Sequence, residues 1–260
     1  MSKLPLINIV TRMSRLEGFR RCRESIDKQT YGIINHIVTV ENDKNEGIVR
    51  ELTDEKNTSI CRVTPVKYVP NLWKSFWYNQ YTQVKELDKW KYKLWDGLEK
   101  TSKIAMYNGC RFKVNHFPYN LYCLKAEKFV KDGWIIYLDD DDYFHDEKSL
   151  ELIVNNIINH DEDTIHWMRT INDNGVGGGQ PGAPYPPDYV MEHLKGDIPP
   201  ALNLICSSNF CFHSKWLPYT AWETWRGDDY RTASSLAAKI NKNNAIYEVV
   251  IDKRKKQRNG

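Results

Sequence analysis

Four consecutive aspartates, Asp139 to Asp142, are the residues whose type and spacing most clearly indicate chemistry. They directly follow a short apolar run, Trp134 to Leu138, which is typical of a strand buried in a parallel sheet. Such a strand delivers the carboxylates to the carboxyl edge of the sheet, where open α/β sheets bind ligands. Adjacent carboxylates repel one another unless a cation neutralises them, and hard divalent metals prefer oxygen ligands. The pattern therefore predicts a metal or nucleotide site.

A structural role is the alternative for each acidic group, because turns and helix starts also favour Asp. Asp146 is expected to be the N-cap of a helix over 147–159, whose apolar positions recur with helical spacing. A second acidic pair, Asp228 and Asp229, precedes another apolar helical stripe, so either residue could cap that helix.

The remaining pattern predicts an α/β fold with a mainly parallel central sheet flanked by helices. Apolar runs that predict strands are found at 6–10, 34–40, 60–66, 134–138, 164–169, 202–212 and 245–251. A helix with Phe19, Cys22 and Ile26 on one face separates the first two strands and ends near Gln29. This strand–helix–strand order is typical of βαβ units, whose right-handed crossovers place the strand carboxyl ends on one edge.

Length and composition predict one large domain over 1–252. Within it, an aromatic-rich helical insertion is expected at about 70–110 and a mobile Gly/Pro-rich loop at about 173–200. The 37 basic residues nearly balance the 34 acidic ones, so nothing in the overall charge indicates a nucleic-acid partner. The basic C-terminal tail, 253–260, is interpreted as a solvated end in preference to a weak surface contact.

The six cysteines form no Cys-x-x-Cys pair, so we expect free thiols in a reducing compartment and no zinc site. The chain shows neither a secretory h-region nor a run of about 18 apolar residues. We therefore expect a cytoplasmic protein without a membrane span.

Several segments together resemble the GT-A glycosyltransferases, specifically the family-2-like inverting, metal-dependent enzymes. The matching segments are Ile7–Arg12, Arg21–Ile26 with Gln29-Thr30-Tyr31, Val38–Asp43, Ile135–Asp142 and Gly227–Tyr230. The chain departs from the family where Glu41-Asn42-Asp43 replaces the usual Asp-Asp-Gly-Ser, and where Asp228 replaces a Glu.

The resemblance implies a role for each matching residue. Nucleotide-sugar binding would involve Thr11, Arg12, Glu41, Asp43, Asn120, Asp139 and Asp140. The metal, Mn²⁺ or Mg²⁺, would be bound by Asp141 with Asp139 and Asp142. Asp229 would be the general base, with Asp228 as its catalytic neighbour.

These parts suit a single displacement in which a hydroxyl of a glycan or glycoconjugate acceptor attacks the donor sugar with inversion. The expected enzyme is a hexosyl- or pentosyltransferase, and UDP-sugar is the expected donor because it is the commonest in the family. One alternative is a non-catalytic nucleotide- or glycan-binding module. Another is a nucleotidyltransferase of related fold, which is disfavoured because no glycine follows the first strand before Gly18.

Overall fold

The computed structural model describes residues 4–54, 56–63, 120–172, 175–177, 205–220, 222 and 228–254. The predicted insertion at about 70–110 and most of the predicted loop at 173–200 lie outside these residues, so both stay predictions. Within the described part of the chain, no helix is long and apolar enough to cross a membrane.

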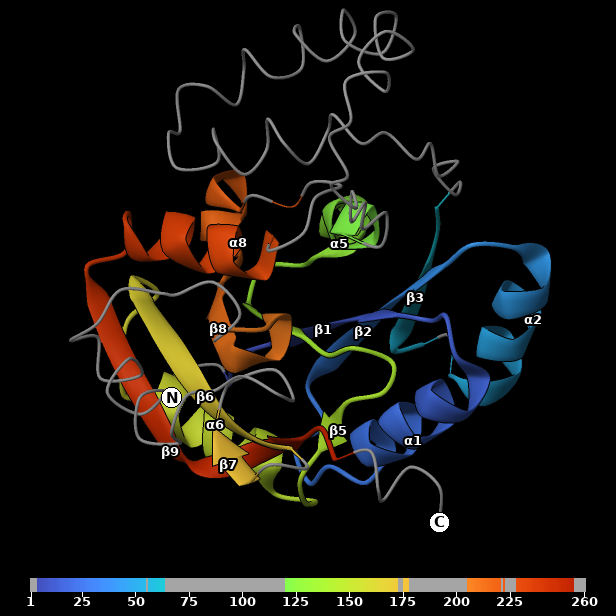
Figure 1. The fold of residues 1–260 in the computed structure, drawn as a ribbon, viewed down its shortest axis with the longest axis horizontal. Coiled ribbons are helices and arrows are strands. Elements are labelled where there is room, and N and C mark those ends of the chain that lie inside the picture. Colours follow the sequence, from blue (N-terminus) through green and yellow to red (C-terminus); the bar gives the residue numbers. More distant parts are fainter. Residues whose placement is uncertain are drawn as a thin grey trace, which may run out of the picture. The chain divides into compact units, whose positions relative to one another are not determined.

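Among the described residues, nine strands form one sheet in the order β3-β2-β1-β4-β8-β6-β9-β5, with β7 paired to β6; the arrangement is shown in Figure 1. Their bounds are β1 Ile7–Arg12, β2 Ile34–Val40, β3 Thr58–Arg62, β4 Trp134–Tyr137, β5 Tyr143–Phe144, β6 Thr164–Asn172, β7 Gly175–Gly177, β8 Phe210–His213 and β9 Lys242–Asp252. The pairs β1–β2, β2–β3, β1–β4 and β6–β9 are parallel, and β8 is antiparallel to both β4 and β6. Strands β1 to β4, β6 and β9 therefore share one direction, which confirms the mainly parallel α/β sheet.

Helices cover both faces of this sheet (Figure 1). The helices are α1 Leu16–Asp27, α2 Asp43–Leu52, α5 Asn120–Ala126, α6 Ser149–Ile157 and α8 Asp228–Ala237. One core cluster joins α1 and α6 to the sheet through residues such as Cys22 and Ile153, packed with Ile9 and Ile136. A second joins α5 and α8 to the opposite face through Ala126 and Leu236, packed with Ile135 and Tyr137. Successive β4 side chains thus enter opposite cores, as expected for a strand buried on both faces.

Two elements differ from the sequence-based expectations. Helix α2 was not predicted; it starts beyond β2 because Asn42 is an N-cap whose side chain accepts a hydrogen bond from the Asn45 amide at 2.9 Å. Within the stretch predicted as a strand at 202–212, the described residues form a short 3₁₀ turn, Ser207–Asn209, before β8.

The predicted N-cap of the helix after the aspartates was wrong. Helix α6 begins at Ser149 with Lys148 at the cap position and no side-chain cap. Asp146 instead accepts a hydrogen bond from the Lys148 amide at 2.8 Å, in the turn before the helix.

Candidate functional site

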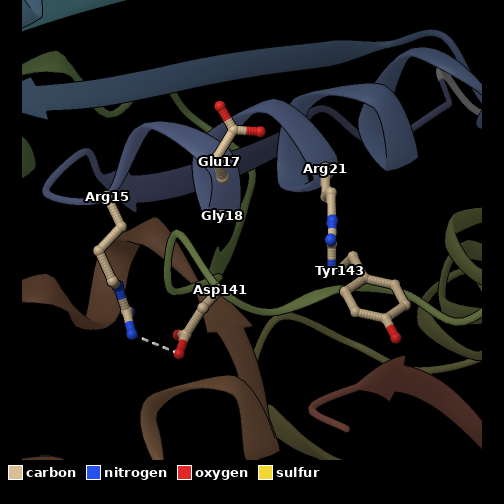
Figure 2. A pocket seen from close by; sticks show the side chains of 6 residues that line it. All are labelled: Arg15, Glu17, Gly18, Arg21, Asp141 and Tyr143. Atoms are coloured by element: carbon tan, nitrogen blue, oxygen red, sulfur yellow. Dashed lines mark hydrogen bonds and ion pairs between the residues drawn. The ribbon is translucent and has the colours of Figure 1, made fainter. Parts of the chain in front are cut away.

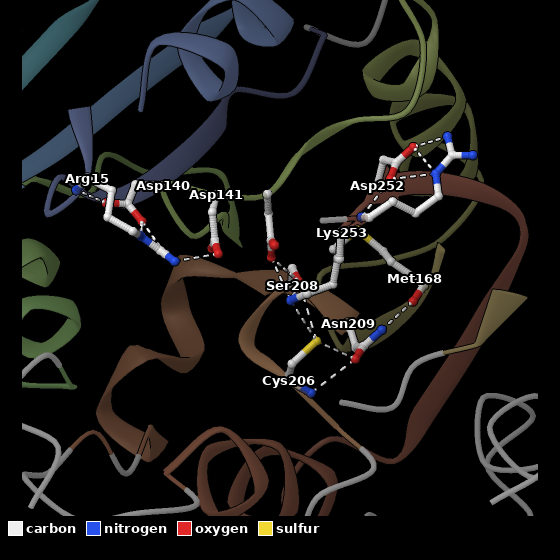
Figure 3. A network of polar contacts seen from close by, with 11 residues as sticks. Arg15, Asp140, Asp141, Met168, Cys206, Ser208, Asn209, Asp252 and Lys253 are labelled. Atoms are coloured by element: carbon white, nitrogen blue, oxygen red, sulfur yellow. Dashed lines mark hydrogen bonds and ion pairs between the residues drawn. The ribbon is translucent and has the colours of Figure 1, made fainter. Parts of the chain in front are cut away.

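The four aspartates leave the carboxyl end of β4 as a tight turn, which we call the Asp loop (residues 139–142). The Asp142 amide donates to the Asp139 carbonyl at 2.9 Å and closes the turn. The side chains of the loop have different partners; Asp140 and Asp141, for example, both lie beside Arg15, away from the contacts around Lys253 (Figure 3).

Asp140 points into the protein and is fully buried. Its Oδ2 accepts from the amides of Ser14 and Arg15, both at 2.6 Å, and from the Ser14 hydroxyl at 2.8 Å. Its Oδ1 accepts from Nε and Nη2 of Arg15 at 3.0 and 2.5 Å. Both carboxylate oxygens are thus bonded to residues of the connection between β1 and α1, and these bonds fix the Asp loop. Asp140 could bind a donor only if some of these hydrogen bonds were broken.

Asp141 lies at the mouth of a cavity of about 210 Å³ next to α1. The cavity is lined by Arg15, Glu17, Gly18, Arg21, Asp141 and Tyr143 (Figure 2). Arg15 Nη1 reaches Asp141 Oδ2 at 2.5 Å, so one guanidinium bridges Asp140 and Asp141. The Asp141 side chain is 18% exposed, whereas that of Asp140 is fully buried.

Asp142 is buried and forms an ion pair of 2.6 Å with Lys253. Its Oδ2 also accepts from the Ser208 hydroxyl at 3.1 Å. Burial raises the pKa of Asp142, and the Lys253 ammonium opposes that rise. Burial alone would lower the pKa of Lys253, but the carboxylates of Asp142 and Asp139 raise it well above its ordinary value. We conclude that Lys253 stays protonated and that Asp142 is its counterion.

The pairing of Lys253 corrects one sequence-based interpretation. Lys253 and Arg254 were assigned to the solvated basic tail, yet both are held by the domain. Lys253 is paired with Asp142, and Arg254 pairs with the buried Asp252. The remainder of that tail lies outside the described residues.

Asp229 lies in the first turn of α8 and interacts electrostatically with Asp139 of the Asp loop. Burial and the charge of Asp139 raise the pKa of Asp229 to about 7, while Lys253 and the Ser207 amide act in the opposite direction. A carboxyl with such a pKa can take up a proton near neutral pH. The structure therefore brings Asp139 and Asp229 close enough for the charge of one to act on the other. Asp228 is the first residue of α8, and its side chain lies outside the described part.

A second polar group gathers at the carboxyl ends of β1 and β2. Tyr122 of α5 donates a hydrogen bond to the Glu41 carboxylate, and the positive charge of Arg12 acts on the same phenol. Burial raises the pKa of Tyr122, and Glu41 raises it further. Asn120 begins the same helix, and its side chain is not described. Two of the predicted nucleotide-contacting residues, Arg12 and Glu41, thus lie near each other.

Two other predicted nucleotide-contacting residues are placed elsewhere. Thr11 is fully buried, and its hydroxyl lies 3.1 Å from Nε2 of His36 in the core. Because adjacent strand residues point to opposite faces, Thr11 and Arg12 cannot present side chains to one site. Asp43 is exposed at the start of α2 and forms an ion pair with Arg62.

A divalent metal fits a restricted part of the Asp loop. No cluster of three or more His, Cys, Asp or Glu suited to a metal occurs among the described residues. Magnesium-type ions, however, are commonly bound by one or two carboxylates together with substrate phosphates and water. Asp139 and Asp141 are the candidates for this role, because Asp140 and Asp142 are buried against Arg15 and Lys253, whereas Asp141, although it also pairs with Arg15, is 18% exposed.

Three residues of the two polar groups were missed by sequence reasoning. Arg15 and Lys253 neutralise the aspartates, and Tyr122 orients Glu41. The position of Arg15, between the first strand and its helix, was the signal that could have identified it. Lys253 gave no such signal, because its basic neighbours resemble a solvated tail.

Comparison with known proteins supports the fold. No protein-family model and no curated protein matches the chain. Its structure is similar to that of S. aureus TarS 1-349, with a TM-score of 0.58 and 12% identity over 97% of this chain and 61% of that chain. TarS structures in complex with UDP-GlcNAc and with UDP match with TM-scores of 0.53 and 0.55, at 10% and 11% identity. They cover 96% of this chain in both cases, and 58% and 60% of those chains.

These values show a shared fold, in agreement with the GT-A-like arrangement expected from the sequence. This chain spans about 61% of the length of that first TarS chain. At such low identity the likeness carries no assignment of individual residues.

Proposed function

We propose that this protein is a glycosyltransferase that uses a nucleotide-sugar donor, with UDP-sugar as the donor and a hydroxyl of a glycan or glycoconjugate as the acceptor. One arrangement carries the proposal: Asp229, in the first turn of α8, interacts with Asp139 of the acidic loop at the carboxyl edge of the sheet, and this charge together with burial raises the pKa of Asp229 to about 7. That arrangement supplies a base beside a site suited to a charged donor.

The donor end of the site is proposed at the carboxyl ends of β1, β2 and β4. Arg12, Glu41 and Asn120 are proposed to contact the nucleotide, and Asp139 the ribose. The choice of UDP is supported by the binding of UDP and UDP-GlcNAc in the structurally similar TarS. Arg15, whose guanidinium is half exposed beside Asp141, is available to contact a phosphate oxygen.

The acceptor end of the site is proposed around α8. Asp229 takes the proton from the acceptor hydroxyl as that oxygen attacks the anomeric carbon of the donor. An in-line attack with one carboxylate as base inverts the anomeric centre. A divalent ion on Asp139 and Asp141, when bound, neutralises the diphosphate charge and makes it a better leaving group. Asp228 is proposed as a neighbour that helps to position the acceptor.

The test is a panel of UDP-, GDP-, dTDP- and CMP-sugars with and without Mn²⁺, scored by release of free nucleotide and by thermal shift. We expect metal-dependent release and stabilisation with UDP-sugars. Well-folded protein that responds to none of the donors would overturn the proposal.

The same panel separates the other candidate functions. A nucleotide- or glycan-binding module would show a thermal shift without turnover under any condition. A nucleotidyltransferase would instead consume a nucleoside triphosphate and release pyrophosphate, so a parallel assay for pyrophosphate distinguishes it.

A further inference from the structure

The register between strands β5 and β9 places Lys253 next to the Asp loop. Strands β5 and β9 are antiparallel, with Tyr143 opposite Asp252 and Phe144 opposite Ile251. Continuing the same register by one residue puts Asp142 opposite Lys253, and these side chains form the 2.6 Å ion pair. The last strand of the domain therefore delivers a cation directly to the last residue of the Asp loop.

The preceding pair in the register is also anchored by side chains. Asp252 is buried and accepts from the Arg254 amide and Nε at 2.9 and 3.0 Å, and from the Tyr143 side chain. His145 Nδ1 lies 3.6 Å from the same carboxylate. The backbone around Lys253 is thus fixed on both sides, so its ammonium has a defined position.

Further contacts hold the ammonium itself (Figure 3). Lys253 Nζ donates to the Ser208 hydroxyl at 3.0 Å and lies 3.3 Å from Cys206 Sγ, and the side chain is 14% exposed. Ser208 in turn donates to Asp142, so Lys253, Ser208 and Asp142 form a closed triangle of contacts. A long flexible side chain held in this way has lost its rotamer freedom before any ligand arrives.

Lys253 also opposes the charges at the candidate catalytic centre. The charge of Asp139 raises the pKa of Lys253, and the charge of Lys253 lowers the pKa of Asp229. One buried cation therefore interacts with carboxylates from the loop and from α8. Without it, Asp142 would be a buried carboxylate lacking its ion-pair partner, and the loop would have to rearrange to solvate that group.

We propose that Lys253 is a positioning residue that acts through Asp142, holding the Asp loop in the single conformation that presents Asp139 and Asp141 to the donor. The catalytic part of this inference rests on the proposed function; the structural part does not.

The test compares wild type with Lys253→Met, Lys253→Arg, Asp142→Asn and the double variant Asp142→Asn/Lys253→Met. Lys242→Met is the matched control, because Lys242 lies at the other end of β9 in an exposed ion pair with Asp161. The readout that is independent of activity is hydrogen exchange of the Asp loop. Lys253→Met is expected to speed that exchange at least tenfold, with little change in β1, and Lys253→Arg to restore most of the protection.

In nucleotide-release assays, Lys253→Met is expected to lower kcat at least tenfold while KM for the acceptor changes less than threefold. The double variant should be no slower than Lys253→Met, because both changes remove the same interaction. The control Lys242→Met should match wild type in both assays.

Unchanged hydrogen exchange of the Asp loop in Lys253→Met would overturn the positioning role. So would a loss of kcat in the double variant that equals the product of the losses in the two single variants. If wild type itself releases no nucleotide from any donor, the proposed function fails. The loop-exchange result then still decides whether Lys253 positions the loop.

Discussion

Gly18 packs directly against the backbone of Asp140. A Cβ built on Gly18 would lie 2.5 Å from the Asp140 carbonyl oxygen and 3.4 Å from the Asp141 Cα. Helix α1 can therefore approach the Asp loop this closely only because position 18 has no side chain. Together with the bonds from Ser14 and Arg15 to Asp140, this contact ties the loop to the start of α1.

Gly18→Ala is accordingly expected to destabilise the protein, by about 1–3 kcal/mol, because the new methyl group must displace backbone atoms. Gly47 in α2 is the matched control, since nothing lies within 4 Å of a Cβ built there. Gly47→Ala should instead stabilise by roughly 0.5–1 kcal/mol through helix propensity. Denaturant unfolding of both variants measures the difference, and a stabilising Gly18→Ala would contradict the close contact.

Arg15→Lys is expected to destabilise the protein although the charge is retained. Nε and Nη2 of the planar guanidinium both donate to Oδ1 of Asp140 while Nη1 reaches Asp141, a geometry that an ammonium cannot reproduce. Because Arg15 is 52% exposed, we expect a modest loss of about 1–2 kcal/mol in unfolding free energy. Arg20→Lys, in an exposed i,i+3 pair with Glu17 on the same helix, should change stability by less than about 0.5 kcal/mol. Equal effects of the two substitutions would refute the bridging role.

Glu127 should make stability depend on pH near neutrality. Burial raises its pKa to about 7, although the contact with Thr220 lowers it in part. Thr220 Oγ1 lies 2.7 Å from Glu127 Oε1 and 2.8 Å from the Leu217 carbonyl. Since a hydroxyl has only one proton to donate, a protonated Glu127 satisfies both contacts.

The native state then holds a proton on Glu127 that the unfolded chain releases near the ordinary pKa of 4.5. Its contribution to stability is present in full below that value and is lost as pH rises through about 7. Glu127→Gln, which mimics the protonated form, should therefore gain stability relative to wild type with rising pH, by about 1–2 kcal/mol after allowance for partial exposure. Unfolding of both proteins between about pH 5 and pH 8 measures this gain, and a constant difference between them would rule it out.

Asp229 should set the acidic limb of the pH–rate profile. The base works only when deprotonated, and burial together with Asp139 raises its pKa to about 7. The rate of nucleotide release should rise up to tenfold per pH unit below that pKa and level off above it. A bound divalent cation would move the inflection to lower pH, because positive charge favours the carboxylate. A rate independent of pH between about 5 and 8 would exclude Asp229 as the base.

The strands that carry the site could be predicted because their signals are local. The apolar run before Asp139 and the apolar stripe after Asp229 each identify one element and its end. Such patterns predict which acidic residues lie at the sheet edge. They do not reveal which partners neutralise those residues.

The surroundings of each residue could not be predicted because they depend on strand order and register. Asp142 meets Lys253 only through the β5–β9 register, and a run of basic residues is otherwise typical of a solvated end. Thr11 was predicted to contact the nucleotide because the alternation of side chains along a strand shows which residues share a face, but not which face binds the ligand. Asp140 was predicted to belong to the same site because nothing in the sequence around it indicates its ion pair with Arg15.

The most direct test of the account is UDP release from UDP-GlcNAc in the presence of Mn²⁺ and a glycan acceptor, for wild type and Asp229→Asn side by side. Asp163→Asn, an exposed acid paired with Lys215, is the control. We predict metal-dependent release by wild type and the control, with a loss of roughly 10²–10⁴-fold in Asp229→Asn and undiminished UDP binding. Equal rates in wild type and Asp229→Asn, or no UDP binding by wild type with Mn²⁺, would contradict the account.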